Sequence, residues 1–168
     1  MTELMYYIIS AIFDVAVAAI LALAALNDAK TRIVRPSLQL SLFAIAVAHF
    51  IFVLGTAYFG NLSIVKPMDA WMLPISGALM FAIYITMVLI FKAGIGGADT
   101  KVTSTMALYL GLFPCLIMII SHFVAAIVYV VYEKVKNHRH IASVPLMVFI
   151  GIGYAVTLIV KWATILIQ

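Results

Sequence analysis

The chain has 168 residues, of which 67% are hydrophobic and only 10% are charged, and its formal net charge is +4 at pH 7. Soluble domains usually carry about 25% charged and about 45–50% apolar residues. This composition therefore excludes an ordinary soluble protein and predicts one integral membrane domain over residues 1–168. The lone cysteine, Cys115, excludes an internal disulfide and a paired-cysteine metal site.

Four apolar runs are each long enough to cross the ~30 Å hydrocarbon core of a membrane as a helix. They cover residues 4–26, 38–59, 70–91 and 144–166. A fifth run, 102–132, would exceed the bilayer as one straight helix at ~1.5 Å per residue. Gly111 and Pro114 interrupt this run, so we expect it to turn back on itself as two helices, each shorter than usual.

Basic residues gather in three of the gaps between these runs. Eight of the ten Lys and Arg residues lie at 27–36, 92–101 and 133–142. The positive-inside rule makes these gaps cytoplasmic, which places both termini outside and predicts an all-α bundle of six transmembrane helices. A five-helix arrangement would put 133–142 outside. The positive charge is thus a signal of membrane orientation and does not indicate nucleic-acid binding.

Two acidic residues flank the cytoplasmic membrane edge in this topology. Asp28 closes the first run, and Asp99 opens the fifth run directly after a glycine-rich stretch. Two converging carboxylates resemble an aspartic-protease pair, in which one acid stays protonated while the other activates a water to attack a peptide carbonyl. Glycines beside Asp99, at Gly94, Gly96 and Gly97, would let a substrate backbone approach closely.

The same carboxylates also have plain structural interpretations. Asp99 is suited to cap the N-terminus of a helix, and Asp28 to be an interfacial charge paired with Lys30 or Arg32. Asp69 precedes an apolar run on the outer side, and we expect it to cap that helix.

Asp14 differs because it falls in the middle of the first apolar run, where a charge is costly and often functional. It precedes Asp28 by close to four helical turns, so both share a face that points into the bundle, ~21 Å apart. We therefore expect Asp14 to make a structural polar contact, with His49 or His122. The alternatives are a role in water entry or substrate binding, or a polar path with Asp28 in a small ion or proton transporter or channel.

The order of two motifs is typical of one family. The stretch "DAKTRIVRP" begins at Asp28, and "GIGGADTK" contains Asp99 and Lys101; a short polar loop then leads to "HIASVPLMVFIGIGY". This arrangement resembles the type IV prepilin peptidase family, particularly its short single-domain members and the archaeal preflagellin and prepilin peptidases. Two departures are Ala98, where the family's GxGD motif has glycine, and "IVRPS" in place of the Ile-Pro-Asn common after the first aspartate.

The resemblance implies a multi-pass protein of the cytoplasmic membrane that is an aspartic endopeptidase, with Asp28 and Asp99 as the catalytic pair. It further implies that the partners are prepilin- or preflagellin-like precursors, whose class III signal peptide is a basic leader ending in Gly before a hydrophobic helix. We expect cleavage at the cytoplasmic edge, without N-methylation and without a metal or organic cofactor. Lys101 would hold the neighbouring carboxylate ionised or touch lipid phosphates. An inactive scaffolding bundle is the remaining alternative.

Overall fold

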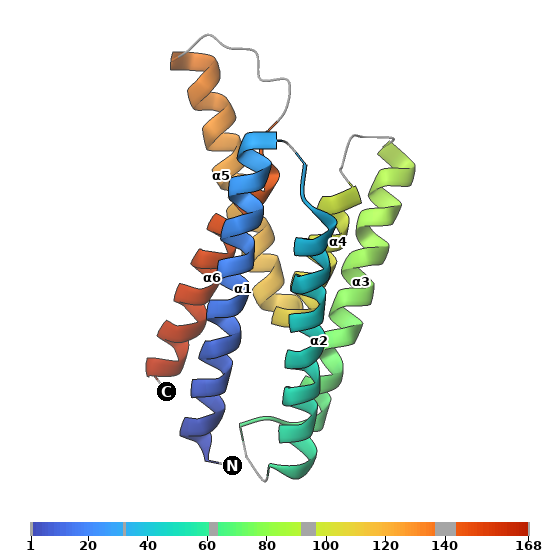
Figure 1. Cartoon of the computed structure of the whole chain (residues 1–168), viewed down its shortest axis with the longest axis vertical. Helices are drawn as coiled ribbons and strands as arrows, with labels where there is room; N and C mark the ends of the chain where they lie inside the picture. Colours follow the sequence, from blue (N-terminus) through green and yellow to red (C-terminus); the bar gives the residue numbers. More distant parts are fainter. Residues whose placement is uncertain (1, 32, 61–63, 92–96, 137–143, 168) are drawn as a thin grey trace.

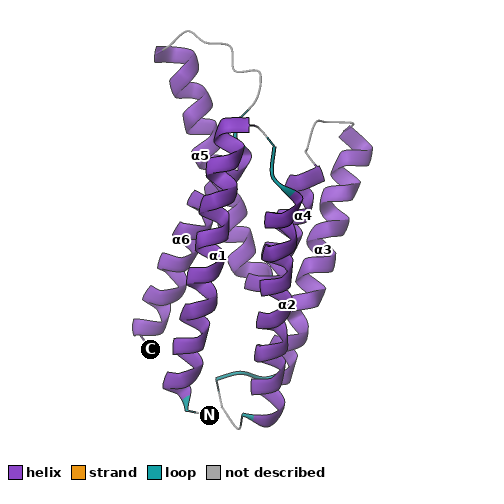
Figure 2. Ribbon diagram, in the orientation of Figure 1, coloured by secondary structure: helices purple, strands orange, loops and turns teal. Residues whose placement is uncertain are grey.

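The computed structural model describes residues 2–31, 33–60, 64–91, 97–136 and 144–167 of the chain. Within these ranges the chain forms six α-helices and no strand (Figure 2), which confirms the all-α prediction. The helices are α1 (Glu3–Thr31), α2 (Pro36–Phe59), α3 (Pro67–Phe91), α4 (Gly97–Leu110), α5 (Leu112–Lys136) and α6 (Leu146–Ile167). They stand side by side as a bundle (Figure 1).

Five of the described helices, all except α4, are long and apolar enough to cross a membrane. α4 has only 14 residues, or about 21 Å, so it is too short to cross alone. In Figure 1 it runs from one end of the bundle to the middle, where α5 begins and returns toward the same end. The predicted break at Gly111 is therefore confirmed. The expectation of two short helices is wrong for α5, which has 25 residues.

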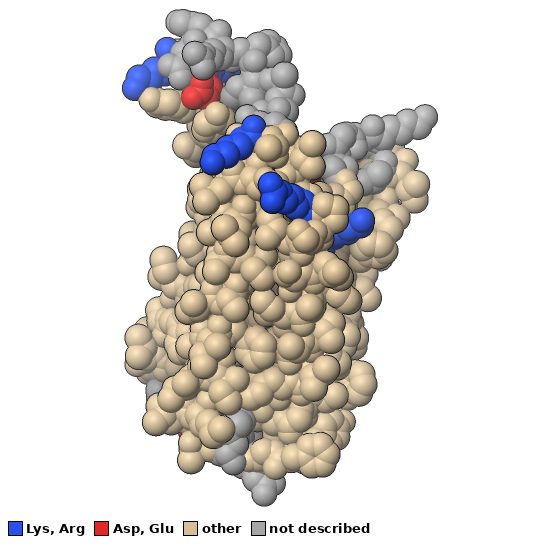
Figure 3. All heavy atoms as spheres, in the orientation of Figure 1, with Lys and Arg blue, Asp and Glu red and all other residues tan. Residues whose placement is uncertain are grey.

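The two ends of the bundle differ in charge. Both chain termini lie at one end, which we call the terminal end (Figure 1). Lys and Arg side chains gather over the opposite end, which we call the basic end (Figure 3). The described basic residues there come from the last turn of α1, the link before α2, the first turns of α4 and the last turn of α5: Lys30, Arg35, Lys101, Lys134 and Lys136.

One face of α1 is buried along its whole length. Its buried residues recur every three or four positions, the spacing that keeps side chains on one face of a helix. They are Ser10, Asp14, Val17, Leu21, Ala24 and Asp28. This face packs the helix against α6 and α2, while α4 packs against α2, α3 and α5. Methionines from three helices, Met106, Met118 and Met147, are fully buried where these contacts meet.

The helices α5 and α6 approach each other closely at Gly153. A Cβ atom at this position would collide with the backbone carbonyl oxygen of Met118 and lie 3.2 Å from the Cβ of His122. Two residues earlier on the same helix, Gly151 would meet nothing within 4 Å. The two glycines therefore form a matched pair for testing this contact.

We predict that Gly153→Ala destabilises the protein by about 1–3 kcal/mol, because the added methyl group overpacks the contact between α5 and α6. Gly151→Ala should be neutral or slightly stabilising, since alanine favours the helix and the space is open. Thermal unfolding of both variants in detergent measures the difference. Equal melting temperatures would show that α5 and α6 do not pack this way.

Candidate functional site

Asp28 lies in the last turns of α1 and reaches the start of α6. Its side chain is 7% exposed, and its Oδ2 atom accepts a hydrogen bond from the backbone N–H of Met147 at 3.0 Å. The first N–H groups of a helix have no partner within that helix, and the positive end of the helix dipole favours a carboxylate there. Asp28 thus joins the end of α1 to the beginning of α6 and is held in one orientation.

The backbone after Asp28 is held by side chains of the same turn. The Asn27 Nδ2 group donates to the Ile33 carbonyl at 2.6 Å, and the Thr31 hydroxyl donates to the Asn27 carbonyl at 2.8 Å. Among the described residues no ion pair joins Asp28 to Lys30. The other partner considered from the sequence, Arg32, lies outside the described residues. The burial of Asp28 is therefore explained by its bond to α6.

Asp99 lies within the first turn of α4, which begins at Gly97, and its side chain is half-buried. The interpretation of Asp99 as an N-terminal cap stays a prediction, because the residues just before Gly97 lie outside the described residues. Buried Tyr84 of α3 is near enough to interact electrostatically with Asp99. A Cβ atom on Gly97 would meet none of the described residues within 4 Å. Gly94 and Gly96 lie outside the described residues.

The structure brings both carboxylates to the basic end of the bundle. Asp28 is in the last turns of α1 and Asp99 in the first turn of α4, and both helices pack against α2. Val34 and Val102, close to them along the chain, belong to one hydrophobic core cluster. The meeting of the two acids around one water stays a prediction.

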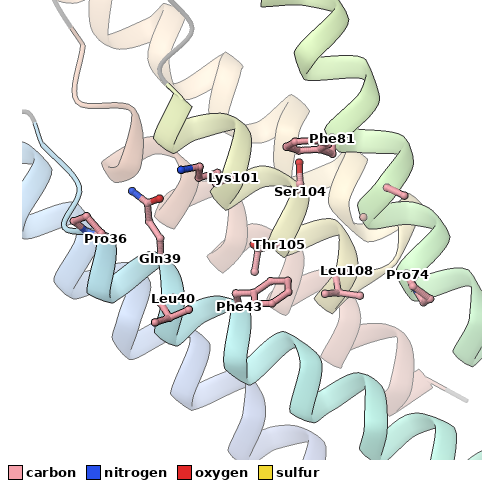
Figure 4. Close-up of a pocket in the computed structure, with 12 residues that line it drawn as sticks. Pro36, Gln39, Leu40, Phe43, Pro74, Phe81, Lys101, Ser104, Thr105 and Leu108 are labelled. Carbon is pink, nitrogen blue, oxygen red and sulfur yellow. The ribbon is translucent and has the colours of Figure 1, made fainter.

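Lys101 is exposed and lies at the edge of a groove with a volume of about 700 Å³ between α2, α3 and α4 (Figure 4). We call this the α2–α4 groove. Gln39 of α2 lies near Lys101 at the same end of the groove, and most of the other side chains that line it are apolar. The sequence predicted Lys101 as a substrate-binding or pocket residue, together with Gly94, Gly96 and Gly97, but it contained no signal for the groove.

Asp14 makes the densest set of polar contacts described in the bundle. Its side chain is buried, and its two oxygen atoms accept bonds from α4 and α6. The donors are the Tyr109 hydroxyl at 2.7 Å, the Lys161 Nζ at 2.7 Å, the Trp162 Nε1 at 3.1 Å and the Tyr154 hydroxyl at 3.4 Å. The expected structural polar contact is therefore present. The expected partners are wrong, because neither His49 nor His122 makes it.

The two histidines have other surroundings. His49 packs against the Tyr109 ring at 4.5 Å between centroids, and its Nδ1 atom has no hydrogen-bond partner. Both ring nitrogens of His122 are likewise unpartnered. Within the described ranges, no three His, Cys, Asp or Glu side chains come together as a metal site requires. A lysine inside the last apolar run, Lys161, was the sequence signal for the true partner of Asp14.

An apolar layer separates Asp14 from Asp28. The buried residues between them on α1 are Val17, Leu21 and Ala24, each at most 4% exposed. A transporter that used both acids would need polar side chains along this face. The described face of α1 therefore offers no polar path from one acid to the other.

Comparison with known proteins gives one match. The sequence model of the type IV leader peptidase family matches residues 15–131. The matched segment includes Asp28, Asp99 and all of α2, α3 and α4. No curated protein and no solved structure matches the chain at a significant level.

We predict that Lys161→Met destabilises the protein by about 3–5 kcal/mol, because it leaves the buried Asp14 carboxylate without its cation. Lys66→Met, at an exposed position in the link before α3, should have little effect. The double variant Asp14→Leu with Lys161→Met should be less destabilised than Lys161→Met alone, since no buried charge remains. Thermal unfolding in detergent measures all three. A Lys161→Met variant as stable as the Lys66→Met control would contradict the assignment.

Proposed function

The chain belongs to the type IV leader peptidase family, and from that premise we propose that it is an aspartic endopeptidase of the cytoplasmic membrane. Its substrates are prepilin- or preflagellin-like precursors, from which it removes a class III signal peptide. The observation that carries the proposal is the placement of Asp28 and Asp99 at one end of the bundle, in the last turns of one helix and the first turn of another.

The proposed chemistry needs one water and one proton shared by the two acids. Like charges at short range cannot both ionise, so one carboxyl group stays protonated and the pair titrates as a unit. The ionised carboxylate takes a proton from the water, whose oxygen attacks the peptide carbon. The other acid donates its proton to the carbonyl oxygen. As the tetrahedral intermediate collapses, the first acid passes the proton from water to the leaving amine, and the other acid takes its proton back from the hydroxyl group. Both acids have then returned to their starting forms.

Three features of the basic end support this chemistry. The bond from Met147 orients the Asp28 carboxylate, and Gly97 begins α4 without a side chain that would obstruct a substrate backbone. The site lies at the end of the membrane-spanning helices, where a leader outside the bilayer meets a helix inside it. The basic residues of this end favour its placement on the cytoplasmic side.

The proposed reaction ends with cleavage and includes no N-methylation. Large bacterial members of the family carry a cysteine-bearing cytoplasmic domain for methylation, whereas this sequence resembles the short single-domain members. The single cysteine here, Cys115, is instead fully buried among the helices.

We predict that Asp28→Asn and Asp99→Asn each lower the cleavage rate by about 10²–10⁴-fold, because each removes one acid–base group. An asparagine at position 28 keeps an oxygen that can accept the Met147 N–H, so the fold should survive. Asp69→Asn is the matched control, since Asp69 accepts the Lys66 N–H at 3.1 Å and caps α3 at the terminal end. The measurement is cleavage of a membrane-inserted precursor, with the product N-terminus identified by mass spectrometry.

Two results would count against the proposal. Cleavage by both single variants at the wild-type rate would show that neither carboxylate is catalytic. A methylated product N-terminus would contradict the restriction to cleavage.

A further inference from the structure

The α2–α4 groove starts beside the candidate site and runs toward the middle of the bundle. Its floor is α4, from Lys101 at the basic end to Leu108 (Figure 4). These positions are seven residues apart, so the floor is about 10 Å long, or about two helical turns. Lys101 follows Asp99 by two residues, so the groove opens within one helical turn of the candidate site, although the two side chains leave α4 on different sides.

The polarity of the groove changes along its length. Near the basic end, Lys101 and Gln39 lie on facing helices, and Ser104 follows one turn deeper (Figure 4). Beyond these residues Thr105 adds one more hydroxyl group, and the other walls are the side chains of Phe43 and Leu108 and further apolar groups. An occupant should therefore have a polar end at the membrane edge and an apolar body inside the bilayer.

The walls of the groove are held in place without an occupant. Gly77 of α3 lies so close to α4 that a Cβ atom there would be 3.0 Å from the Cβ of Leu108 and 3.3 Å from the Ser104 carbonyl oxygen. On the other wall, Pro36 begins α2 with a backbone angle already suited to a helix. A preformed apolar groove suits an amphipathic or apolar helix, which binds through side chains spaced three and four residues apart.

We propose that the α2–α4 groove seats the first two turns of the precursor's hydrophobic helix, the part that directly follows the scissile bond. This inference rests on the proposed function, because that function supplies a substrate with a polar leader and an apolar helix. The polar end of the groove receives the start of the helix next to Asp99. The apolar part then holds the precursor's helix parallel to α4, so that the scissile bond lies near the carboxylates.

Cysteine crosslinking tests the placement directly. Cys115→Ser gives a chain without cysteine, and a single cysteine is then introduced on α2 at Leu40 or at Ser41. Both positions are exposed and lie at the same depth, but only Leu40, with 69% of its surface exposed, lines the groove. The precursor carries one cysteine in the first two turns of its helix. After mild oxidation, Leu40→Cys should give severalfold more disulfide-linked adduct than Ser41→Cys.

The outcomes separate this inference from the proposed function. Cleavage of the precursor by the Cys115→Ser protein is measured in parallel. If the enzyme is active and both positions give equal amounts of adduct, the inference about the groove is wrong and the proposed peptidase function is unaffected. If only Leu40→Cys gives adduct and the precursor is not cleaved, the result supports binding of the precursor in the groove and contradicts the proposed peptidase function. A disulfide between two enzyme chains that excludes the precursor would also overturn the groove, since a second copy would then occupy it.

A second variant tests the groove by filling it. Ala78 is exposed and lines the groove, whereas Ala48 is exposed on α2 away from it. Ala78→Trp should raise the KM for the full precursor about tenfold, equivalent to about 1.4 kcal/mol. Ala48→Trp makes the same change of size outside the groove and should leave KM unchanged. Equal KM values for the two variants would overturn the inference.

Discussion

The constraint on which this fold depends is the reversal of the chain inside an apolar environment, where unpaired backbone groups are too costly to persist. Gly111 makes the reversal with a φ of 81°, a backbone conformation that favours glycine. Its N–H donates to the Ala107 carbonyl at 2.9 Å, and its own carbonyl accepts the Cys115 N–H at 3.2 Å. The turn is therefore satisfied within the chain. Because it occurs so early, α4 ends in mid-bundle and forms the floor of a groove.

The polar contacts of Asp14 hold the helices together close to this reversal. Tyr109, in the last turn of α4, donates to Asp14 of α1, and Lys161 of α6 pairs with the same carboxylate. The buried charge thus connects three helices just before the chain turns. It also fixes the height at which α4 stops, and hence the position of Asp99 one helix length away. We assign Asp14 this structural role, distinct from that of the two acids at the basic end.

The sequence predicted the features that depend on composition and on helix-breaking residues. The apolar runs marked the helices, Gly111 marked the reversal, and the motifs around Asp28 and Asp99 indicated the family that the comparison confirms. The unequal lengths of α4 and α5 were not predicted, although Gly111 lies near the start of the run 102–132 and therefore already implied them. The partners of Asp14 and the bond from Met147 to Asp28 join positions more than 90 residues apart, which no local pattern reveals.

The apolar layer on α1 has a consequence for the cell that carries the protein. An aspartic protease must admit water to its carboxylates. A water-filled site that was open to both sides of the membrane would conduct protons across it. Val17, Leu21 and Ala24 close the described face of α1 below Asp28. The proposed hydrolysis would then take place at one surface, and the buried face of α1 would offer no polar route along which protons could cross the bilayer.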